Sequence, residues 1–181
     1  LETNDGGDLI VGTVDGVVGL RNTASTGYSP LLAIQLETTN GDLTVNNDIY
    51  TSRRNMFLVA QQGNGGAGDS TFTNNANIIN ADSGSNANNG QIDIRGNNIE
   101  LNQGSTISAV NRVILEDDPS STATVAIDLG GADGVNTLGL TDAELDTVTT
   151  PGVLQIGHSG SGDITITDAI TLDPSKVGSL E

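Results

Sequence analysis

The chain contains no cysteine, which excludes a disulfide framework, a thiolate metal site and a cysteine nucleophile. Aromatic residues are almost as scarce: two Tyr, two Phe and no Trp. Large rings usually fill the centre of a compact globule. We therefore expect a narrow core that needs only one layer of aliphatic side chains, which Ile, Leu and Val supply in quantity.

Basic residues are few, and long apolar runs are absent. Six Lys and Arg stand against 23 Asp and Glu, for a formal net charge of -17. Such a field repels nucleic acid and anionic membranes, so we expect neither as a partner. The run MFLVA (56–60) is among the longest apolar segments, far below the roughly 20 residues of a membrane span. The opening LETNDGGD does not resemble a signal peptide, and we expect residues 1–181 to be one domain excised from a longer protein.

A short pattern recurs five times along the chain. Each copy has Gly, then a polar residue, then an alternating stretch whose third and fifth positions are mostly apolar. The copies are GDLIV (7–11), GDLTV (41–45), GDSTF (68–72), GQIDI (90–94) and GDITI (162–166). Segments 111–115 and 136–140 fit less well, with Asn in place of Gly. Period-two alternation indicates β-strands with one apolar face.

Further strand candidates lie between these copies. They are residues 31–36, 46–50, 56–60, 95–101, 153–156 and 167–172. Two or three short strands per period, without long amphipathic helices, predict an all-β parallel β-solenoid whose coils stack about 4.8 Å apart. The seven starts predict about seven coils. An antiparallel β-sandwich also has short strands at regular spacing and stays the structural alternative.

The solenoid predicts a single column of small aliphatic side chains. Its expected members are Leu9, Val11, Leu43, Val45, Phe72, Ile92, Ile94, Val113, Leu115, Leu138, Leu140, Ile164 and Ile166. Residues 73–90 are rich in Asn, which tolerates left-handed backbone. We interpret them as a turn-rich excursion between coils, held by stacked Asn side chains, with disorder as the alternative.

One short helix is well signalled near residues 142–147. Thr141 and Glu144 form a Thr-x-x-Glu capping box, and Leu140 and Leu145 can close a hydrophobic staple around it. The TTPG at 149–152 limits the helix to about two turns.

The segment from this helix onward resembles a repeated segment of large bacterial exoproteins of the filamentous haemagglutinin type. The matching parts are the LGLTDAELD helix start (138–146), the LQIG strand (154–157) and the Gly-headed GDITI strand (162–166). The resemblance covers residues 126–172, about a quarter of the chain. It implies a right-handed parallel β-helix in an exported adhesin or filament, with the helix at a corner between coils. The amino-terminal secretion motif of such proteins does not occur in this sequence.

Two Gly-rich segments resemble the calcium-binding nonapeptide Gly-Gly-x-Gly-x-Asp. In GGAGDST (65–71) Asp69 comes one residue early, and GGADG (130–134) fails similarly. Tandem copies, which share each ion, are also missing. The acidic segment EDDPS (116–120) could bind calcium only adventitiously. We therefore predict neither a metal site nor a cofactor.

Catalytic candidates are few. Asp117–Asp118 is an adjacent acidic pair, and His158 is the only histidine. Glycoside hydrolysis needs two carboxylates placed across a sugar, and adjacent strand residues point to opposite faces. The basic candidates, none in a recognisable motif, are Arg21, Arg53, Arg54, Arg95, Arg112, Lys176 and His158. No Gly-x-Ser-x-Gly elbow accompanies the histidine, so we interpret both sites as solvated turns. Thr-x-Thr at 71–73, 122–124 and 165–167 does not recur at one place in every coil, as an ice-binding face requires.

These observations predict a non-enzymatic structural or adhesive module of a large secreted or surface-attached bacterial protein. The expected location is extracellular or on the bacterial surface. The expected partner is a glycan or cell-surface ligand, or neighbouring coils of the parent protein. The alternatives are a carbohydrate-active β-helix enzyme and a calcium-dependent extracellular assembly module.

Overall fold

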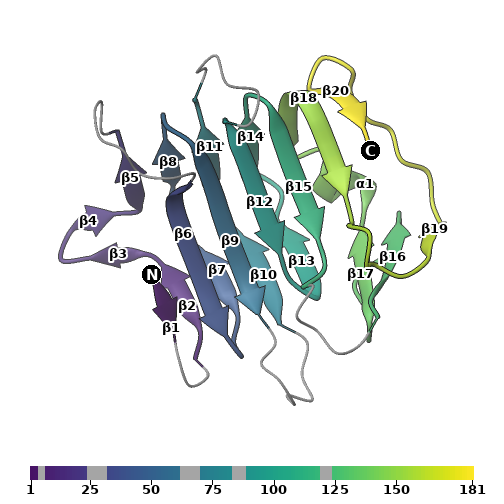
Figure 1. Cartoon of the computed structure of the whole chain (residues 1–181), viewed down its shortest axis with the longest axis horizontal. Helices are drawn as coiled ribbons and strands as arrows, with labels where there is room; N and C mark the ends of the chain where they lie inside the picture. The colour runs from purple at the N-terminus through teal and green to yellow at the C-terminus, as the bar shows by residue number, and fades with distance from the viewer. Residues whose placement is uncertain (4–6, 24–31, 62–69, 83–88, 119–123) are drawn as a thin grey trace.

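The protein is described here by a computed structural model, which covers residues 1–3, 7–23, 32–61, 70–82, 89–118 and 124–181. It is all-β apart from one short helix, α1 (Asp142–Leu145), and solenoid-like. Parallel strands from successive passes of the chain stack side by side from the N-terminal to the C-terminal end (Figure 1). No helix among the described residues is long and apolar enough to cross a membrane.

A large sheet faces the viewer in Figure 1, and we call it the front sheet. All of its pairings are parallel. In spatial order its strands are β1 (Glu2–Thr3), β6 (Leu32–Thr39), β9 (Asn55–Gln61), β12 (Gln91–Arg95), β15 (Arg112–Glu116), β18 (Val148–Ile156) and β20 (Val177–Leu180).

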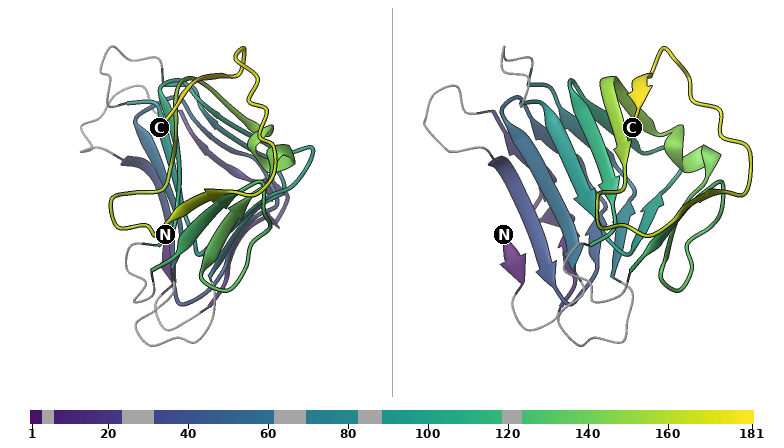
Figure 2. Two further views of the ribbon diagram at one scale, coloured as in Figure 1. Left: turned by 90° about the vertical axis from the view of Figure 1, so that its right-hand side faces the viewer. Right: turned by 45° about the vertical axis from the view of Figure 1, so that its right-hand side comes forward.

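Two further stacks lie behind the front sheet. The second stack contains β2 (Leu9–Val11), β7 (Leu43–Val45), β10 (Thr71–Asn74) and β13 (Asn98–Leu101), with β17 (Thr137–Leu140), β16 (Ala126–Leu129) and β19 (Ile164–Ile166) beyond it. The third stack contains β5 (Leu20–Asn22), β8 (Ile49–Thr51), β11 (Asn77–Asn80), β14 (Thr106–Ala109) and the start of β18. A hairpin, β3 (Thr13–Val14) and β4 (Val17–Val18), supplies the one antiparallel strand pair among the described strands. Because β18 joins the front sheet to the third stack, the wall is nearly closed (Figure 2).

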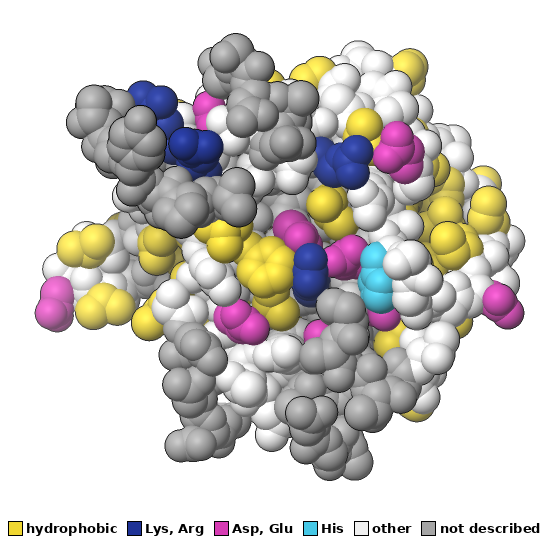
Figure 3. Space-filling model, viewed as in Figure 1, with side chains coloured by type: hydrophobic (Ala, Val, Ile, Leu, Met, Phe, Trp, Pro, Cys, Tyr) yellow, Lys and Arg dark blue, Asp and Glu magenta, His cyan; other side chains and the backbone are white. Residues whose placement is uncertain are grey.

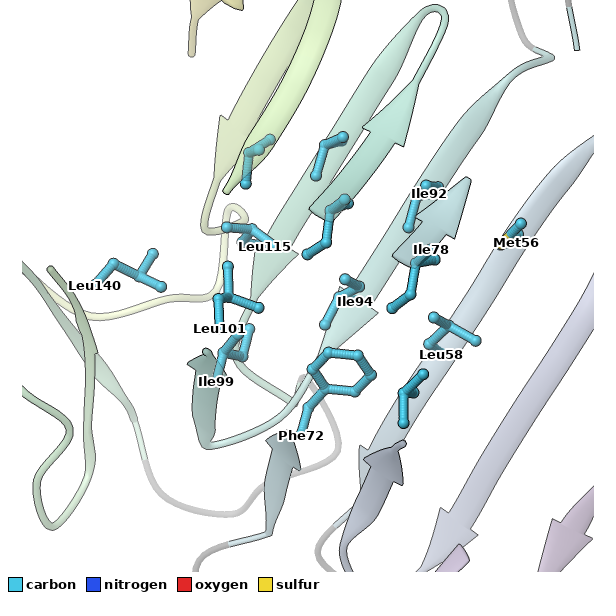
Figure 4. Packing of buried hydrophobic residues seen from close by; sticks show 14 of the residues in the cluster. Met56, Leu58, Phe72, Ile78, Ile92, Ile94, Ile99, Leu101, Leu115 and Leu140 are labelled. Carbon is cyan, nitrogen blue, oxygen red and sulfur yellow. The ribbon is translucent and has the colours of Figure 1, made fainter. Parts of the chain in front are cut away.

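The interior consists of columns of aliphatic side chains contributed by the three stacks. Alternating burial along the strands, such as that of β12 and β14, turns every second residue inward. One front-sheet column runs Leu36, Leu58, Ile94, Leu115 and Ile156. Figure 4 shows several such side chains between the facing strands, with Phe72 as the one large ring. The scarcity of aromatic residues therefore matches a core only a few side chains wide.

Most of the expected core is buried, with three exceptions. Leu9 is only partly buried, and Ile164 and Ile166 are 57% and 71% exposed. Both isoleucines are in register with buried residues of β16, Ile127 and Leu129. They face the interior but lie on an edge strand that no described strand covers. The core prediction was therefore wrong for these two residues.

The Gly-headed pattern does not mark one place in every pass of the chain. Its first three copies contribute to β2, β7 and β10 of the second stack, whereas GQIDI forms β12 of the front sheet. Ile92 consequently pairs with Met56 and Val113, and Phe72 pairs with Ile99. The pattern identifies strands correctly. Treating all copies as equivalent positions was wrong, because a glycine followed by alternating apolar and polar residues can occur at any corner that leads into a strand.

Two local predictions also need correction. Residues 167–172 form no strand, although Ile170 and Leu172 pack against the core. The Asn-rich segment is not simply an excursion, because β10 and β11 occupy much of 71–80. The stacked Asn side chains do occur: Asn75 Nδ2 donates to Asn46 Oδ1 at 2.8 Å, and Asn102 Nδ2 donates to Asn75 Oδ1 at 2.7 Å. Residues 83–88 lie outside the described part of the chain.

The short helix carries the predicted capping box and an additional contact. Thr141 Oγ1 accepts the backbone N–H of Glu144, and Glu144 Oε2 accepts the N–H of Thr141. The other oxygen, Glu144 Oε1, accepts the N–H of Leu101 in β13 at 3.2 Å. Asp133 acts similarly, accepting N–H groups of Gly139 and Ile99. These two carboxylates therefore take the place of strand carbonyls where the second stack passes from β13 to β17.

Glu144→Ala should destabilise the protein more than Thr141→Ala. Removing the N-cap hydroxyl costs about 1 kcal/mol. Removing Glu144 loses the box and also leaves the N–H of buried Leu101 without its acceptor, so we expect about 2–3 kcal/mol in total. Urea unfolding measures both free energies, and equal losses would contradict the bridging role of Glu144.

Candidate functional site

The outer surface of the front sheet carries two rows of outward side chains in register. One row contains Gln35, Phe57, Asp93, Ile114 and Gln155. The adjacent row contains Glu37, Val59, Arg95 and Glu116. Figure 3 shows basic, acidic and histidine side chains gathered near the centre of this face, beside an apolar patch. We call Asp93, Arg95, Glu116, Asp117, His158 and Ser161 the front cluster.

Arg95 is the centre of the front cluster. Its guanidinium binds both oxygens of Asp93, at 3.0 and 2.9 Å, and its Nε lies 2.7 Å from Glu116 Oε1. Its Cζ also lies 4.5 Å from the centre of the Phe57 ring, a cation–π distance. The three neighbours come from β9, β12 and β15, so one arginine links three adjacent strands.

Asp117 links the end of β15 to the turn after β18. Its Oδ1 accepts the hydroxyl proton of Ser161, and its Oδ2 lies 3.3 Å from His158 Nε2. The N–H of Gly160 donates to His158 Nδ1 at 2.9 Å, so the imidazole proton lies on Nε2 and is donated to Asp117. The side chain of Asp117 is only 4% exposed, and both of its oxygens have partners.

The structure brings together residues that the sequence left as two separate solvated turns. Asp117 and Asp118 are 3% and 2% exposed, and His158 is partly buried. The solvated-turn interpretation of the acidic pair was wrong, because both residues are buried after β15 and Asp117 contacts the turn that carries His158. Arg95 was only one of seven basic candidates, and Glu116 was considered only as part of the acidic segment 116–120. The signal that could have found them is the outward i, i+2 spacing of Asp93 and Arg95, once β12 is placed beside β15.

Burial governs the protonation of Glu116. The pKa of Glu116 is raised to about 7: burial is the largest cause, Asp93 and Asp117 add to the rise, and Arg95 and His158 oppose it. The short Arg95–Glu116 contact favours the carboxylate, but Arg95 shares its charge with Asp93. At the junction between β13 and β17, burial likewise raises the pKa of Asp133 to about 7, with Glu144 and Glu100 adding to the rise.

These pKa values predict that stability falls as pH rises from 5 to 8. A carboxyl group whose pKa is higher in the folded than in the unfolded state stabilises the fold while it is protonated. That contribution is complete below the unfolded pKa, near 4.5 for Glu and 3.8 for Asp, and is lost as pH rises through about 7. The melting temperature of the wild type should therefore drop across this window, and that of Glu116→Gln, Asp133→Asn should change less. Parallel curves for the two proteins would contradict the assignment.

The front cluster lacks the geometry of nucleophilic catalysis. Ser161 Oγ donates to Asp117 and accepts the N–H of His158, so the imidazole does not accept its proton. The only lone pair of the ring, on Nδ1, is taken by Gly160. Glu116 is a proton donor of suitable pKa, yet it is 5% exposed and paired with Arg95. The contacts of the cluster join β9, β12 and β15 to one another and to the turn after β18.

A second feature is a depression of about 430 Å³ beside α1, which we call the corner pocket. Its polar lining includes Gln103, Ser105, Thr106, Asp146, Thr149 and Lys176. Lys176 Nζ donates to the carbonyl of Asp146 at 2.9 Å, which fixes the cation at the rim. Hydroxyl, amide and ammonium groups of this kind can hydrogen-bond the hydroxyl groups of a sugar.

The segments considered for calcium do not assemble a site within the described residues. Residues 65–69 lie outside the described part, and Asp133 of the 130–134 segment accepts backbone N–H groups. Across the described ranges, no group of three or more His, Cys, Asp or Glu side chains is placed to hold a metal ion.

Comparisons of the chain with protein-family models, with curated proteins and with solved structures gave no match. The site is therefore interpreted from its own geometry.

Proposed function

We propose that this chain is a non-enzymatic structural or adhesive module of a large secreted or surface-attached bacterial protein. In this proposal it forms a right-handed parallel β-helix of about seven coils, as in the filamentous haemagglutinin-type proteins that residues 126–172 resemble. The observation that carries the proposal is the front cluster. Its charged groups are buried or half-buried and pair with one another across adjacent strands, so this polar part of the surface strengthens the wall.

The solenoid-like frame supports the same function. Long parallel stacks with aliphatic columns and side-chain ladders make a rigid rod, and rigid rods present binding surfaces at a distance. The expected ligand is a glycan or another cell-surface molecule. We place its contact at the corner pocket, where hydroxyl and amide side chains and the carboxyl group of Asp146 lie beside the cation of Lys176.

The test is a binding screen against immobilised bacterial and host-type glycans. Binding by the wild type should be weakened at least several-fold by Gln103→Ala together with Lys176→Ala. The matched control is Arg21→Ala, which removes a cation from β5 at the other end of the third stack. Equal binding by all three proteins would move the contact away from the corner pocket, and no binding to any surface would remove the adhesive half of the proposal.

A second candidate function, a carbohydrate-active hydrolase, has one observation in its favour. Glu116 has a pKa of about 7, suited to a general acid, with Asp93 and Asp117 close enough to influence it. Incubation with polysaccharides, followed by measurement of new reducing ends, separates the two functions. The module predicts no release. Release by the wild type that Glu116→Gln abolishes, in a variant that stays folded, would establish the hydrolase instead.

A further inference from the structure

The large hydrophobic side chains that are exposed gather at the two ends of the stacks. They are Leu1, Ile10, Val14, Val17, Val18 and Leu20 at one end, and Val135, Ile164, Ile166 and Leu180 at the other. Among the described residues between 32 and 118, no large hydrophobic side chain is as exposed as these. Figure 1 places the strands that carry most of these residues at opposite sides of the molecule.

Many of these side chains belong to the interior columns. Leu20 is in register with Ile49 of the third stack. Glu2 pairs with Glu37, so the preceding residue, Leu1, lies beside Leu36. At the other end, Leu180 pairs with Leu154 of the front sheet. Ile164 and Ile166 continue the second stack in the same way. The columns that reach these positions therefore end in an aliphatic side chain that lacks only the next strand.

The strand edges at the two ends are also compatible. Among the described strands, β1, β2 and β5 each have one parallel neighbour, and so do β19 and β20. All stacking pairs are parallel, so strand direction is the same at both ends. A second copy shifted along the stack axis would offer its first strands to the last strands of the first copy without any reversal. Exposed parallel edges of this kind are templates for strand addition.

We propose that copies of this chain associate head to tail, with the β1, β2 and β5 end of one copy stacked on the β19 and β20 end of the next. The contact is heterologous, because it joins two different surfaces, and it can therefore extend beyond a dimer. It buries the aliphatic residues that terminate the columns and completes the edges of the sheets. This inference does not depend on the proposed function.

The net charge of -17 opposes this contact, so its strength should depend on salt. Screening lengths fall from about 10 Å at 0.1 M to about 3 Å at 1 M ionic strength. We expect multimers of the 18.4 kDa chain to form at high protein concentration and to increase with salt. Sedimentation velocity over a range of protein and salt concentrations measures this directly.

Two end-blocked variants test the geometry. Leu20→Lys blocks the first end, and Ile164→Lys with Ile166→Lys blocks the last; thermal unfolding of each variant shows that the fold is retained before its association is compared. Each variant alone should be a monomer, because every contact joins a first end to a last end and one of these is blocked in every copy. Leu20→Lys retains its last end and the double variant retains its first end, so an equimolar mixture should give a one-to-one dimer.

The matched control is Gln35→Lys, at an exposed position on the outer surface of the front sheet, which adds the same charge as Leu20→Lys. It should associate like the wild type. A wild type that stays monomeric at every concentration and salt tested would overturn the proposal. Dimers formed by either blocked variant on its own would do the same, because they would show a symmetric contact between like ends.

Discussion

Ile92→Asp is expected to unfold the protein, whereas Gln91→Asp on the same strand should leave its stability nearly unchanged. Ile92 is fully buried between Met56 and Val113, where a carboxylate would have neither water nor a partner. The loss should be at least about 4 kcal/mol, a large part of the 5–15 kcal/mol that holds a typical domain. Gln91 faces outward and is in register with Arg112, so a carboxylate there gains a nearby cation.

Circular dichroism and thermal unfolding of the two variants test this prediction. The pair differs by one position on β12 and introduces the same side chain, so composition and net charge are matched. Similar melting temperatures for the two proteins would contradict the inward and outward assignment of this strand.

Gly152→Ala is expected to cost about 3 kcal/mol or more, because the glycine lies against the backbone of the neighbouring strand. A Cβ at this position would lie 1.8 Å from the carbonyl oxygen of Asn111. That carbonyl also accepts the N–H of Val153 at 2.9 Å, so moving it breaks the pairing of β15 with β18. The substitution should therefore loosen the strand that joins the front sheet to the third stack.

Gly134→Ala provides the control for this substitution. A Cβ there would meet only the side chain of Thr137, at 3.8 Å, and the change should stay within about 0.5 kcal/mol. Denaturant titration gives both values. Equal losses would show that flexibility of the unfolded chain, rather than the contact with Asn111, determines the effect.

The sequence was sufficient to predict an all-β, solenoid-like architecture and most of the core. Alternation is a property of each strand alone, so Ile92 and Ile94 could be turned inward without knowing their neighbours. The capping box of α1 was equally local, because Thr141 and Glu144 are three residues apart. The contact of Glu144 with Leu101, 43 residues earlier in the chain, was not predictable, since it depends on which strands lie side by side.

The front cluster was missed for the same reason. Arg95 and Glu116 are 21 residues apart, and only the register of β12 and β15 places them in contact. Spacing between passes of the chain varies, so the Gly-headed pattern could not provide that register. The exposed Ile164 and Ile166 were misplaced because a period-two pattern cannot show whether a further strand covers the column.

The register of β12 supports both the core and the front cluster, and cysteine cross-linking tests it most directly. The chain has no cysteine of its own, so introduced pairs report without interference. Gln91 and Arg112 are Cα partners on adjacent strands, within the Cα distance of about 4.4–6.8 Å that a disulfide spans. We predict that Gln91→Cys, Arg112→Cys forms an intramolecular disulfide under mild oxidation. Equating GQIDI with GDSTF would instead place Asp93 beside Thr71, and a disulfide in Thr71→Cys, Asp93→Cys but not in the first pair would contradict the account.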